Sequence, residues 1–319
     1  MIRLAIDLLG ADTPEEELCR GALSALSKNP DLFLYLCGSA QKVKQLVEAQ
    51  PALAMRCEVV DCPVAVTNYD NPMDAYQQED ASIVKAMKLA KNGADGVITC
   101  GATGAVLVCS IMILGKLHGL RPILAVELRN ACNQPLLLLD CGANIDSRPE
   151  LYLSFAHLGD AYMKCIGYEN PRIALLSNGA EDTKGCEAVK AANTLLRAYD
   201  GIRFVGNIEA THALTGETDV IVCDGFHGNI LLKSIEGSAK AVLAELTQNM
   251  QQIPQATEIL ENVRRKYDYN TQGGAMLLGV RRLVMKGHGS ATGDAVENMI
   301  VREAILAQNR FLQKVEQTV

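Results

Sequence analysis

The sequence predicts a doubly wound α/β fold with a mostly parallel sheet, and three observations lead to this prediction. Short apolar runs recur along the 319 residues, and they are too continuous for strands that expose one face. Longer segments with helical spacing separate these runs, so strand and helix alternate. Almost every run ends in Gly, Asp or Asn, which is typical of tight turns from a strand into a helix.

The apolar runs give the expected strands, which cover residues 3–7, 32–38, 96–101, 123–128, 136–142, 173–179, 204–207, 220–225, 273–280 and 282–290. The main helices between them are expected over residues 15–26, 82–91, 151–163, 184–199 and about 294–313. Residues 236–266 differ, because two helical segments (236–249 and 256–266) flank a break at Ile253-Pro254. We therefore expect one α/β domain over 1–319, with a projecting helical hairpin at 236–266.

Composition excludes several classes of protein. Lys and Arg total 30 against 37 Asp and Glu, and a net charge of -7 argues against a general nucleic-acid binder, which needs a basic face. The 49% hydrophobic and 21% charged residues exclude a disordered chain. No uncharged apolar run reaches the roughly 18 residues that a membrane span needs.

The 11 cysteines suggest packing rather than chemistry. They lie mostly within apolar runs, and neither a CxxC motif nor a Cys/His cluster with zinc spacing occurs. The sequence opens on MIRLAIDLLGAD, which lacks the pattern of a secretory signal. We expect a protein of the reducing cytoplasm whose cysteines are small core residues, with no metal site.

The carboxyl ends of the expected strands form what we call the ligand edge. In open parallel sheets, ligands bind beyond this edge, where glycine lets backbone N–H groups approach an anion. Asp7, Gly101, Asn144, Asp224 and Gly228 all lie at or just after strand ends. Tight turns alone can explain any one of these loops, but their number favours a shared site for an anionic ligand.

Two of these loops have polar groups suited to an anion or a metal. Gly101-Ala102-Thr103-Gly104 follows a strand and opens a helix, so it can cradle phosphate with the Thr103 hydroxyl as donor. It is neither a dinucleotide fingerprint nor a P-loop. Residues 140–146 combine two carboxylates with the Asn144 amide and can bind a metal or orient a nucleophile. The alternative is a helix cap formed by Asp146 or Ser147.

One lysine and two histidines also lie at the ligand edge. Lys184, in a loop bounded by glycines, is a natural partner for phosphate or an oxyanion, although such a lysine is often only solvated. His227 can act as a general base or be an exposed loop histidine. His288, between two glycines, has the same two interpretations.

The combination and spacing of these pieces are more specific than any single motif. The pieces are Asp7…Gly10…Asp12, Gly101…Thr103-Gly104-Ala105, Asp140…Gly142-Ala143-Asn144…Asp146, Glu181…Lys184-Gly185, Asp224-Gly225-Phe226…Gly228-Asn229 and His288-Gly289-Ser290. In this order, the sequence resembles the phosphate acyltransferase (PlsX) family of bacterial fatty acid and phospholipid synthesis, nearly end to end. It departs from the family's pattern at Ala11, Ala102 and residues 76–79.

The resemblance implies a fold, a reaction and partners. The fold is Rossmann-like and related to isopropylmalate dehydrogenase and phosphotransacetylase. The reaction is acyl transfer from acyl carrier protein to inorganic phosphate by a homodimer, without a cofactor or a covalent enzyme nucleophile. We expect Lys184 and Asn229 at the reacting centre. The residues expected to bind substrate and phosphate are Asp7, Gly101, Thr103, Gly104, Asn144, Asp224, Gly228 and His288.

An acidic carrier protein needs a basic patch, and Arg264, Arg265 and Lys266 form the best cluster. A solvated helix face is the alternative interpretation. The hairpin tip at 247–254 offers only Met250 and Ile253 as apolar anchors, so we expect at most weak peripheral membrane association. Two other functions stay open: a phosphate acetyl- or butyryltransferase that uses acyl-coenzyme A, and a non-catalytic paralogue that binds acyl carrier protein.

Overall fold

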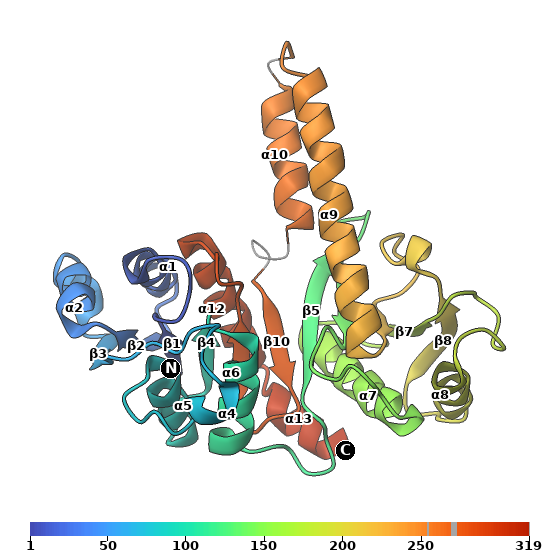
Figure 1. Ribbon diagram of the computed structural model, residues 1–319, viewed down its shortest axis with the longest axis horizontal. Helices are drawn as coiled ribbons and strands as arrows, with labels where there is room; N and C mark the ends of the chain where they lie inside the picture. The colour runs from blue at the N-terminus through green and yellow to red at the C-terminus, as the bar shows by residue number, and fades with distance from the viewer. Residues whose placement is uncertain (254, 269–272, 319) are drawn as a thin grey trace. The chain divides into compact units, whose positions relative to one another are not determined.

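The computed structural model describes residues 1–253, 255–268 and 273–318 (Figure 1). The chain divides into two compact units: unit 1 combines Met1–Pro122 with Gly273–Gln317, and unit 2 contains Ile123–Gln272. The single domain expected over residues 1–319 stays a prediction. Pro254, at the expected break of the hairpin, lies outside the described residues.

Unit 1 is built on a mixed sheet in the order β3-β2-β1-β4-β11-β10. Its strands are β1 (Ile2–Asp7), β2 (Leu32–Gly38), β3 (Cys57–Asp61), β4 (Gly96–Thr99), β10 (Ala275–Leu278) and β11 (Leu283–Lys286). All neighbours are parallel except β10, which runs antiparallel to β11. The sequence did not predict β3, because this edge strand has no buried residue and so lacks an apolar run.

The helices of unit 1 are α1 (Glu15–Lys28), α2 (Ala40–Glu48), α3 (Pro51–Ala54), α4 (Pro72–Ala75), α5 (Ser82–Lys91), α6 (Thr103–Cys109), α12 (Gly293–Gln308) and α13 (Phe311–Thr318). A π-helical segment, Ser110–Leu114, continues α6. The last helix, expected to run unbroken to 313, is interrupted because Arg310 adopts a positive φ of 55°. Helix α5 has the bounds that the sequence predicts.

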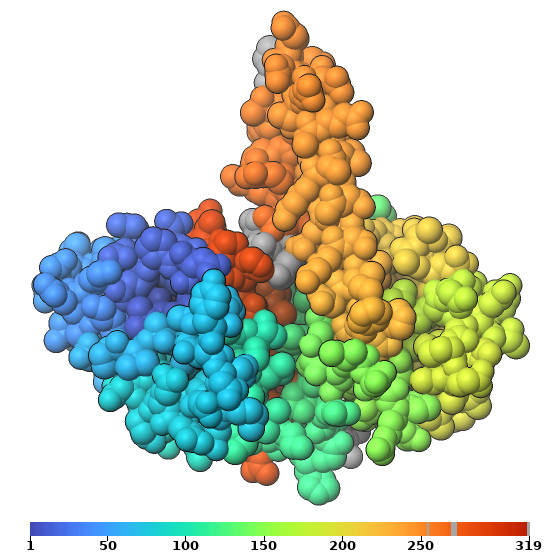
Figure 2. Space-filling view, viewed as in Figure 1, coloured from blue at the N-terminus to red at the C-terminus, as the bar shows by residue number. Residues whose placement is uncertain are grey.

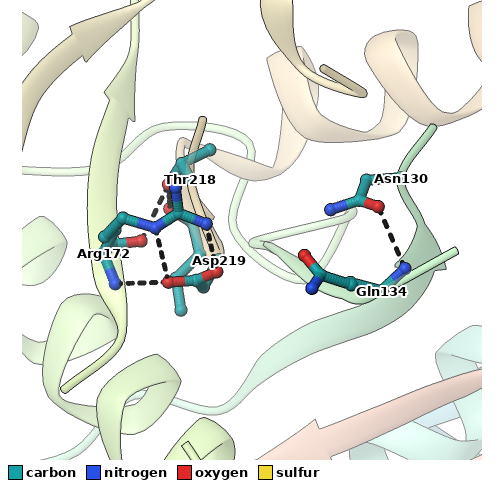
Figure 3. A network of polar contacts seen from close by, with 6 residues as sticks. Asn130, Gln134, Arg172, Thr218 and Asp219 are labelled. Atoms are coloured by element: carbon teal, nitrogen blue, oxygen red, sulfur yellow. Dashed lines mark hydrogen bonds and ion pairs between the residues drawn. The ribbon is translucent and has the colours of Figure 1, made fainter. Parts of the chain in front are cut away.

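In unit 2 the strands follow the order β5-β6-β9-β7-β8. Its strands are β5 (Ile123–Arg129), β6 (Pro135–Leu139), β7 (Arg172–Leu176), β8 (Arg203–Ile208) and β9 (Val220–Val222). Strands β6, β9, β7 and β8 are parallel, whereas β5 pairs antiparallel with β6. The turn between β5 and β6 is tied by the Asn130 Oδ1 atom, which accepts a hydrogen bond from the Gln134 amide at 3.0 Å (Figure 3). The prediction of a mostly parallel α/β fold is confirmed.

A charged network fixes the amino-terminal ends of β7 and β9 (Figure 3). The Arg172 guanidinium donates to both carboxylate oxygens of Asp219, at 2.7 and 3.0 Å, and the Arg172 amide donates to the same carboxylate at 2.7 Å. The Thr218 hydroxyl donates to the Arg172 carbonyl at 2.8 Å. The guanidinium lowers the pKa of Asp219 although burial opposes it, so this pair stays ionised at neutral pH. The carboxyl ends of the same strands lie at the opposite edge.

The helices of unit 2 are α7 (Pro149–Cys165), α8 (Glu187–Arg197), α9 (Gly225–Asn249) and α10 (Ala256–Tyr267), with a 3₁₀ turn at Ala210–His212. Helices α9 and α10 pack side by side as the predicted hairpin, which stands clear of the rest of unit 2 (Figure 2). Helix α9 begins at Gly225 rather than at 236, because the Asp224 carboxylate caps it by accepting the His227 amide at 2.9 Å. Among the described residues, no helix has both the length and the apolarity to cross a membrane.

All 11 cysteines are free thiols, and most pack as the sequence predicts. Cys141 is buried, and burial raises the pKa of its thiol well above the ordinary value, which suits packing rather than nucleophilic chemistry. Cys132 and Cys186 are exposed, so the expectation of core cysteines is wrong for these two.

One buried carboxyl in unit 1, that of Glu303, makes no ion pair with any residue that the structure describes. The Glu303 side chain, on α12, is fully buried against Gly96 of β4, where the carboxyl occupies the space that a side chain would fill. Burial raises its pKa well above the ordinary 4.5. Folding therefore favours the protonated form of this carboxyl.

We predict that Glu303→Gln makes unit 1 less sensitive to pH. In the unfolded chain Glu303 ionises above about pH 4.5, whereas in the folded chain it ionises only at higher pH, so unfolding releases a proton and stability falls as pH rises through this range. Glutamine has the same shape and does not ionise. The melting temperature, measured between about pH 4 and 8, should decline less in Glu303→Gln than in wild type or in the exposed control Glu316→Gln. Parallel declines in all three would contradict the assignment.

Candidate functional site

Unit 1 brings three of the predicted loops together at its ligand edge. The Asp12 and Thr13 amides donate to the Gly289 carbonyl at 2.7 and 3.2 Å, and the Gly287 amide donates to the Thr99 carbonyl at 2.8 Å. The loops after β1, β4 and β11 therefore lie side by side, as expected for the carboxyl ends of parallel strands. Asp7, Gly101, Thr103 and His288 belong to these loops or to the residues that flank them.

The buried side chain of Asp7 supports this edge through hydrogen bonds. It is buried, and its carboxylate accepts the Thr99 hydroxyl at 2.7 Å, while the Thr99 oxygen accepts the Gly101 amide at 3.1 Å. Burial raises the pKa of Asp7 to about 6, although the hydrogen bonds from Thr99 and Leu9 oppose the shift. A short chain of hydrogen bonds therefore runs from the Gly101 amide through the Thr99 hydroxyl to Asp7, and it orients the Gly101 loop.

The remaining predicted residues of unit 1 differ in their surroundings. Thr103 is the first residue of α6 and is half-exposed. Gly104 serves packing, because a Cβ atom there would lie 2.7 Å from Pro72 Cγ on α4. His288 is exposed, and its Nδ1 atom lies 2.8 Å from the Ser290 hydroxyl and accepts the Ser290 amide at 3.2 Å. An accepting Nδ1 leaves the hydrogen of the neutral ring on Nε2.

In unit 2, Asp140 organises the turn that follows β6. Its side chain is fully buried and accepts the backbone amides of Leu124 (2.9 Å), Gly142 (3.2 Å), Ala143 (3.1 Å) and Asn144 (2.7 Å), and the Asn144 side-chain amide at 2.8 Å. Burial raises the pKa of Asp140, and these donors oppose the shift. The explanation by a helix cap at Asp146 or Ser147 is wrong, because the residue before α7 is Arg148 and it makes no side-chain cap.

The turn that Asp140 organises also positions the start of α9. The Asn144 carbonyl accepts the Gly225 amide at 2.7 Å. Gly228 is needed for close approach, because a Cβ atom there would lie 1.9 Å from the Asp140 carbonyl oxygen. Asn144 and Gly228, predicted as ligand-binding residues, are therefore engaged in seating α9.

A cavity of about 550 Å³ opens at the carboxyl ends of β7 and β9. Its polar wall consists of Tyr152, Ser177, Asn178, Cys186, Asp224, His227 and Ser234, and its other lining residues are Leu176, Gly185, Val189, Ala210, Cys223, Ile230 and Leu231. Of the residues predicted to bind substrate, Asp224 lines this cavity. Lys184 is exposed on the loop next to Gly185, and Asn229 is half-buried on α9. Neither is among the lining residues within the described part of the chain.

Asp224 is the centre of the polar wall. Its carboxylate accepts the Tyr152 hydroxyl at 3.3 Å and lies 2.7 Å from His227 Nδ1, in addition to capping α9. Burial raises the pKa of the Tyr152 phenol, and the nearby Asp224 and Cys186 raise it further. Tyr152 therefore stays protonated and acts as a hydrogen-bond donor.

An apolar groove of about 550 Å³ continues along the hairpin. Helix α9 supplies most of its wall, from Leu231 to Leu246, and α10 adds Val263 and Tyr267. The groove and the cavity share Ala210, Leu231 and Ser234. One continuous surface therefore runs from the polar wall at Asp224 to the apolar face of the hairpin.

The basic cluster on α10 is partly neutralised within its own helix. Arg264 and Arg265 are exposed and lie 3.1 and 3.3 Å from the Glu261 carboxylate. The Lys266 ammonium donates to the Ala131 carbonyl at 3.0 Å. The two arginines keep most of their surface in solvent.

Sequence reasoning missed Tyr152 and Cys186. Tyr152 lies in an apolar stretch of α7, 72 residues before its partner Asp224, so no local pattern marks it. Cys186 directly follows Lys184-Gly185 and occupies the residue before α8, a helix-start position that could have distinguished it from the core cysteines.

The fold of the chain is that of solved phosphotransacetylase structures. A phosphotransacetylase from Streptococcus pyogenes aligns with a TM-score of 0.64 at 16% identity, covering 96% of this chain and 94% of that structure. The EutD phosphotransacetylase from Staphylococcus aureus aligns with a TM-score of 0.62 at 14% identity, covering 97% and 94%. At these identities the likeness shows a shared fold.

The family follows from sequence comparison. A family described as "Fatty acid synthesis protein" matches residues 2–314. The phosphate acyltransferase of Syntrophomonas wolfei is 38% identical, covering 93% of this chain and 92% of its own length. That of Clostridium acetobutylicum is 33% identical, covering 98% and 97%. The chain belongs to the phosphate acyltransferase family, the enzymes of fatty acid and phospholipid synthesis, as its motifs predicted.

We predict that Asp140→Asn destabilises unit 2 by about 3 kcal/mol, because an amide NH₂ group replaces an oxygen that accepts buried N–H donors. Chemical denaturation of the variant and the wild type measures the loss. Asp146→Asn is the matched control, since Asp146 is exposed in the same turn. Equal stability of Asp140→Asn and Asp146→Asn would show that the buried carboxylate does not hold the turn.

Proposed function

We propose that this enzyme transfers an acyl group from acyl carrier protein to inorganic phosphate. A phosphate oxygen bonds to the thioester carbonyl carbon, the carbon–sulfur bond breaks, and acyl phosphate and the carrier thiol leave. The observation that carries the proposal is the cavity at the ligand edge of unit 2, in a chain of this family. The cavity has a polar wall for the reacting groups and continues into an apolar groove.

We propose one orientation for the thioester on this surface. Its carbonyl belongs at the polar wall formed by Tyr152, Asp224 and His227, and its hydrocarbon tail belongs in the groove along α9. Burying a methylene in an apolar groove contributes about 0.8 kcal/mol. Longer acyl chains should therefore bind more tightly until the groove is filled.

Lys184 and Asn229 remain our candidates for the reacting centre. Lys184 lies one residue from the cavity wall, and an ammonium there supplies positive charge for phosphate or the developing oxyanion. Asn229 follows Gly228 in the first turns of α9, and a neutral amide can orient the carbonyl without acting as a nucleophile.

We predict that Lys184→Ala and Asn229→Ala each lower turnover by about 10²–10³-fold, the usual cost of losing one transition-state donor. Acyl phosphate is trapped with hydroxylamine and counted as hydroxamate. Lys190→Ala is the matched control, because Lys190 is a lysine of α8 that pairs with Glu187. The melting temperature of every variant should stay that of wild type. Wild-type turnover in both folded variants would remove these residues from the centre.

The same assay separates the donor classes. Hydroxamate from acyl carrier protein and phosphate supports the proposal, whereas hydroxamate from acyl-coenzyme A alone favours a phosphate acetyl- or butyryltransferase. Binding of acyl carrier protein without turnover identifies a non-catalytic paralogue. We also propose that the enzyme acts in the cytoplasm as a homodimer and that it contacts membranes only weakly.

We place the carrier on the exposed Arg264 and Arg265 of α10, with Lys266 at the base of the cluster. We predict that Arg264→Glu/Arg265→Glu weakens carrier binding and removes most of its salt dependence, because the reversed charges also add to Glu261. Titration at low and moderate salt measures both. Lys190→Glu/Arg203→Glu carries the same charge change elsewhere in unit 2 and should bind like wild type. Identical affinity of both double variants at low salt would exclude this surface.

A further inference from the structure

His227 is a titratable side chain of the cavity wall, and no proton transfer has so far been assigned to it. Its side chain is 59% exposed, and it lines the cavity at the start of α9. The Nδ1 atom is engaged by Asp224 at 2.7 Å. Within the described residues, Nε2 has no hydrogen-bond partner, so it is the ring nitrogen that a ligand in the cavity can reach.

The Asp224 carboxylate fixes the chemistry of this ring. Its side chain is only 10% exposed, and it also accepts the His227 amide and the Tyr152 hydroxyl. A carboxylate on Nδ1 holds the hydrogen of the neutral ring there and leaves Nε2 as the proton acceptor.

The reaction needs a proton at one particular atom. Attack of phosphate on a thioester gives a tetrahedral intermediate that can expel either phosphate or thiolate. Phosphate is a weaker base than an alkyl thiolate, whose conjugate acid has a pKa of about 8.5, so the intermediate reverts unless sulfur leaves as a neutral thiol. A general acid beside the sulfur therefore directs the reaction forward.

We propose that His227, held by Asp224, is a catalytic residue that carries this proton from the attacking phosphate to the departing sulfur. The inference rests on the proposed function of the same cavity. As the carbon–oxygen bond forms, the hydrogen phosphate dianion gives its proton to Nε2. The carbon–sulfur bond then breaks, and sulfur leaves with the bonding pair and takes that proton from Nε2. The ring returns to its neutral form, and the products are the acyl phosphate dianion and a neutral thiol, so atoms and charge balance.

The test compares two donors with the same acyl group, the ester of an alkyl thiol (acyl-coenzyme A or acyl carrier protein) and the ester of thiophenol. With the alkyl donor, His227→Ala should lower turnover by about 10²–10⁴-fold, the usual contribution of general acid catalysis. With the thiophenol ester, the same variant should approach wild type, because thiophenolate leaves without protonation. Added imidazole should restore part of the lost rate with the alkyl donor.

His212→Ala is the matched control, since His212 is a second exposed histidine of unit 2 and lies 3.0 Å from a carboxylate, that of Glu217. It should behave like wild type with both donors. The melting temperature of His227→Ala should not change, because the cap on α9 uses the backbone amide of His227.

Three outcomes would overturn the inference. Wild-type rates of His227→Ala with the alkyl donor would show that the imidazole takes no part. An equal loss with both donors would show that His227 positions the substrate and does not protonate the sulfur. If wild-type enzyme forms no acyl phosphate from any donor, the proposed function fails first and the proton transfer fails with it.

Discussion

The buried carboxylate of Asp140 is the interaction on which the ligand edge of unit 2 depends. Removing an ionised carboxylate from water is costly, and five N–H donors offset that cost here. Because four of these five donors come from residues 142–144, the carboxylate determines the path of the chain from β6 to Asn144. The Asn144 carbonyl then receives Gly225, so the direction of α9 follows from the same group.

The two ends of the unit 2 strands differ in how their side chains are engaged. At the amino-terminal ends, Arg172 and Asp219 join β7 to β9 with a bidentate ion pair and a backbone hydrogen bond (Figure 3). At the carboxyl ends, Gly185 and Cys186 line an open cavity together with Asp224. Rigid pairing at one end lets the other end keep exposed polar groups without loosening the sheet.

The sequence predicted the buried parts of the fold well, because burial leaves a pattern. Strands β1 and β4, which have almost no exposed residue, appear as apolar runs, and α5 has the predicted bounds. Edge strand β3 leaves no such pattern. The antiparallel direction of β5 depends on a turn that Asn133 enters with a positive φ of 61°, which apolar periodicity does not encode.

The candidate site was harder to predict, because its contacts join distant segments. The hydrogen bond from Tyr152 to Asp224 joins residues 72 positions apart in the sequence, and no motif near Tyr152 indicates it. Several residues chosen for their chemistry prove to be engaged in the fold: Asn144 seats α9, and Gly104 makes room for Pro72. Loop position therefore predicted which loops lie together at the strand ends, whereas three-dimensional contacts were needed to show which of their residues pack within the fold.

Helix α9 connects the chemistry of the cavity to the apolar groove. Its first turn presents His227, whose geometry Asp224 sets by capping the helix, and its middle turns supply the groove wall from Leu231 to Leu246. A substrate that places its thioester at the first turn therefore lays its tail along the same helix. Because residues of an α-helix rise 1.5 Å each, the length of α9 between the polar wall and the end of the groove sets the distance that an acyl chain can follow. Under the proposed function, the position of the cap sets both the place of the thioester and the chain length that the groove accommodates.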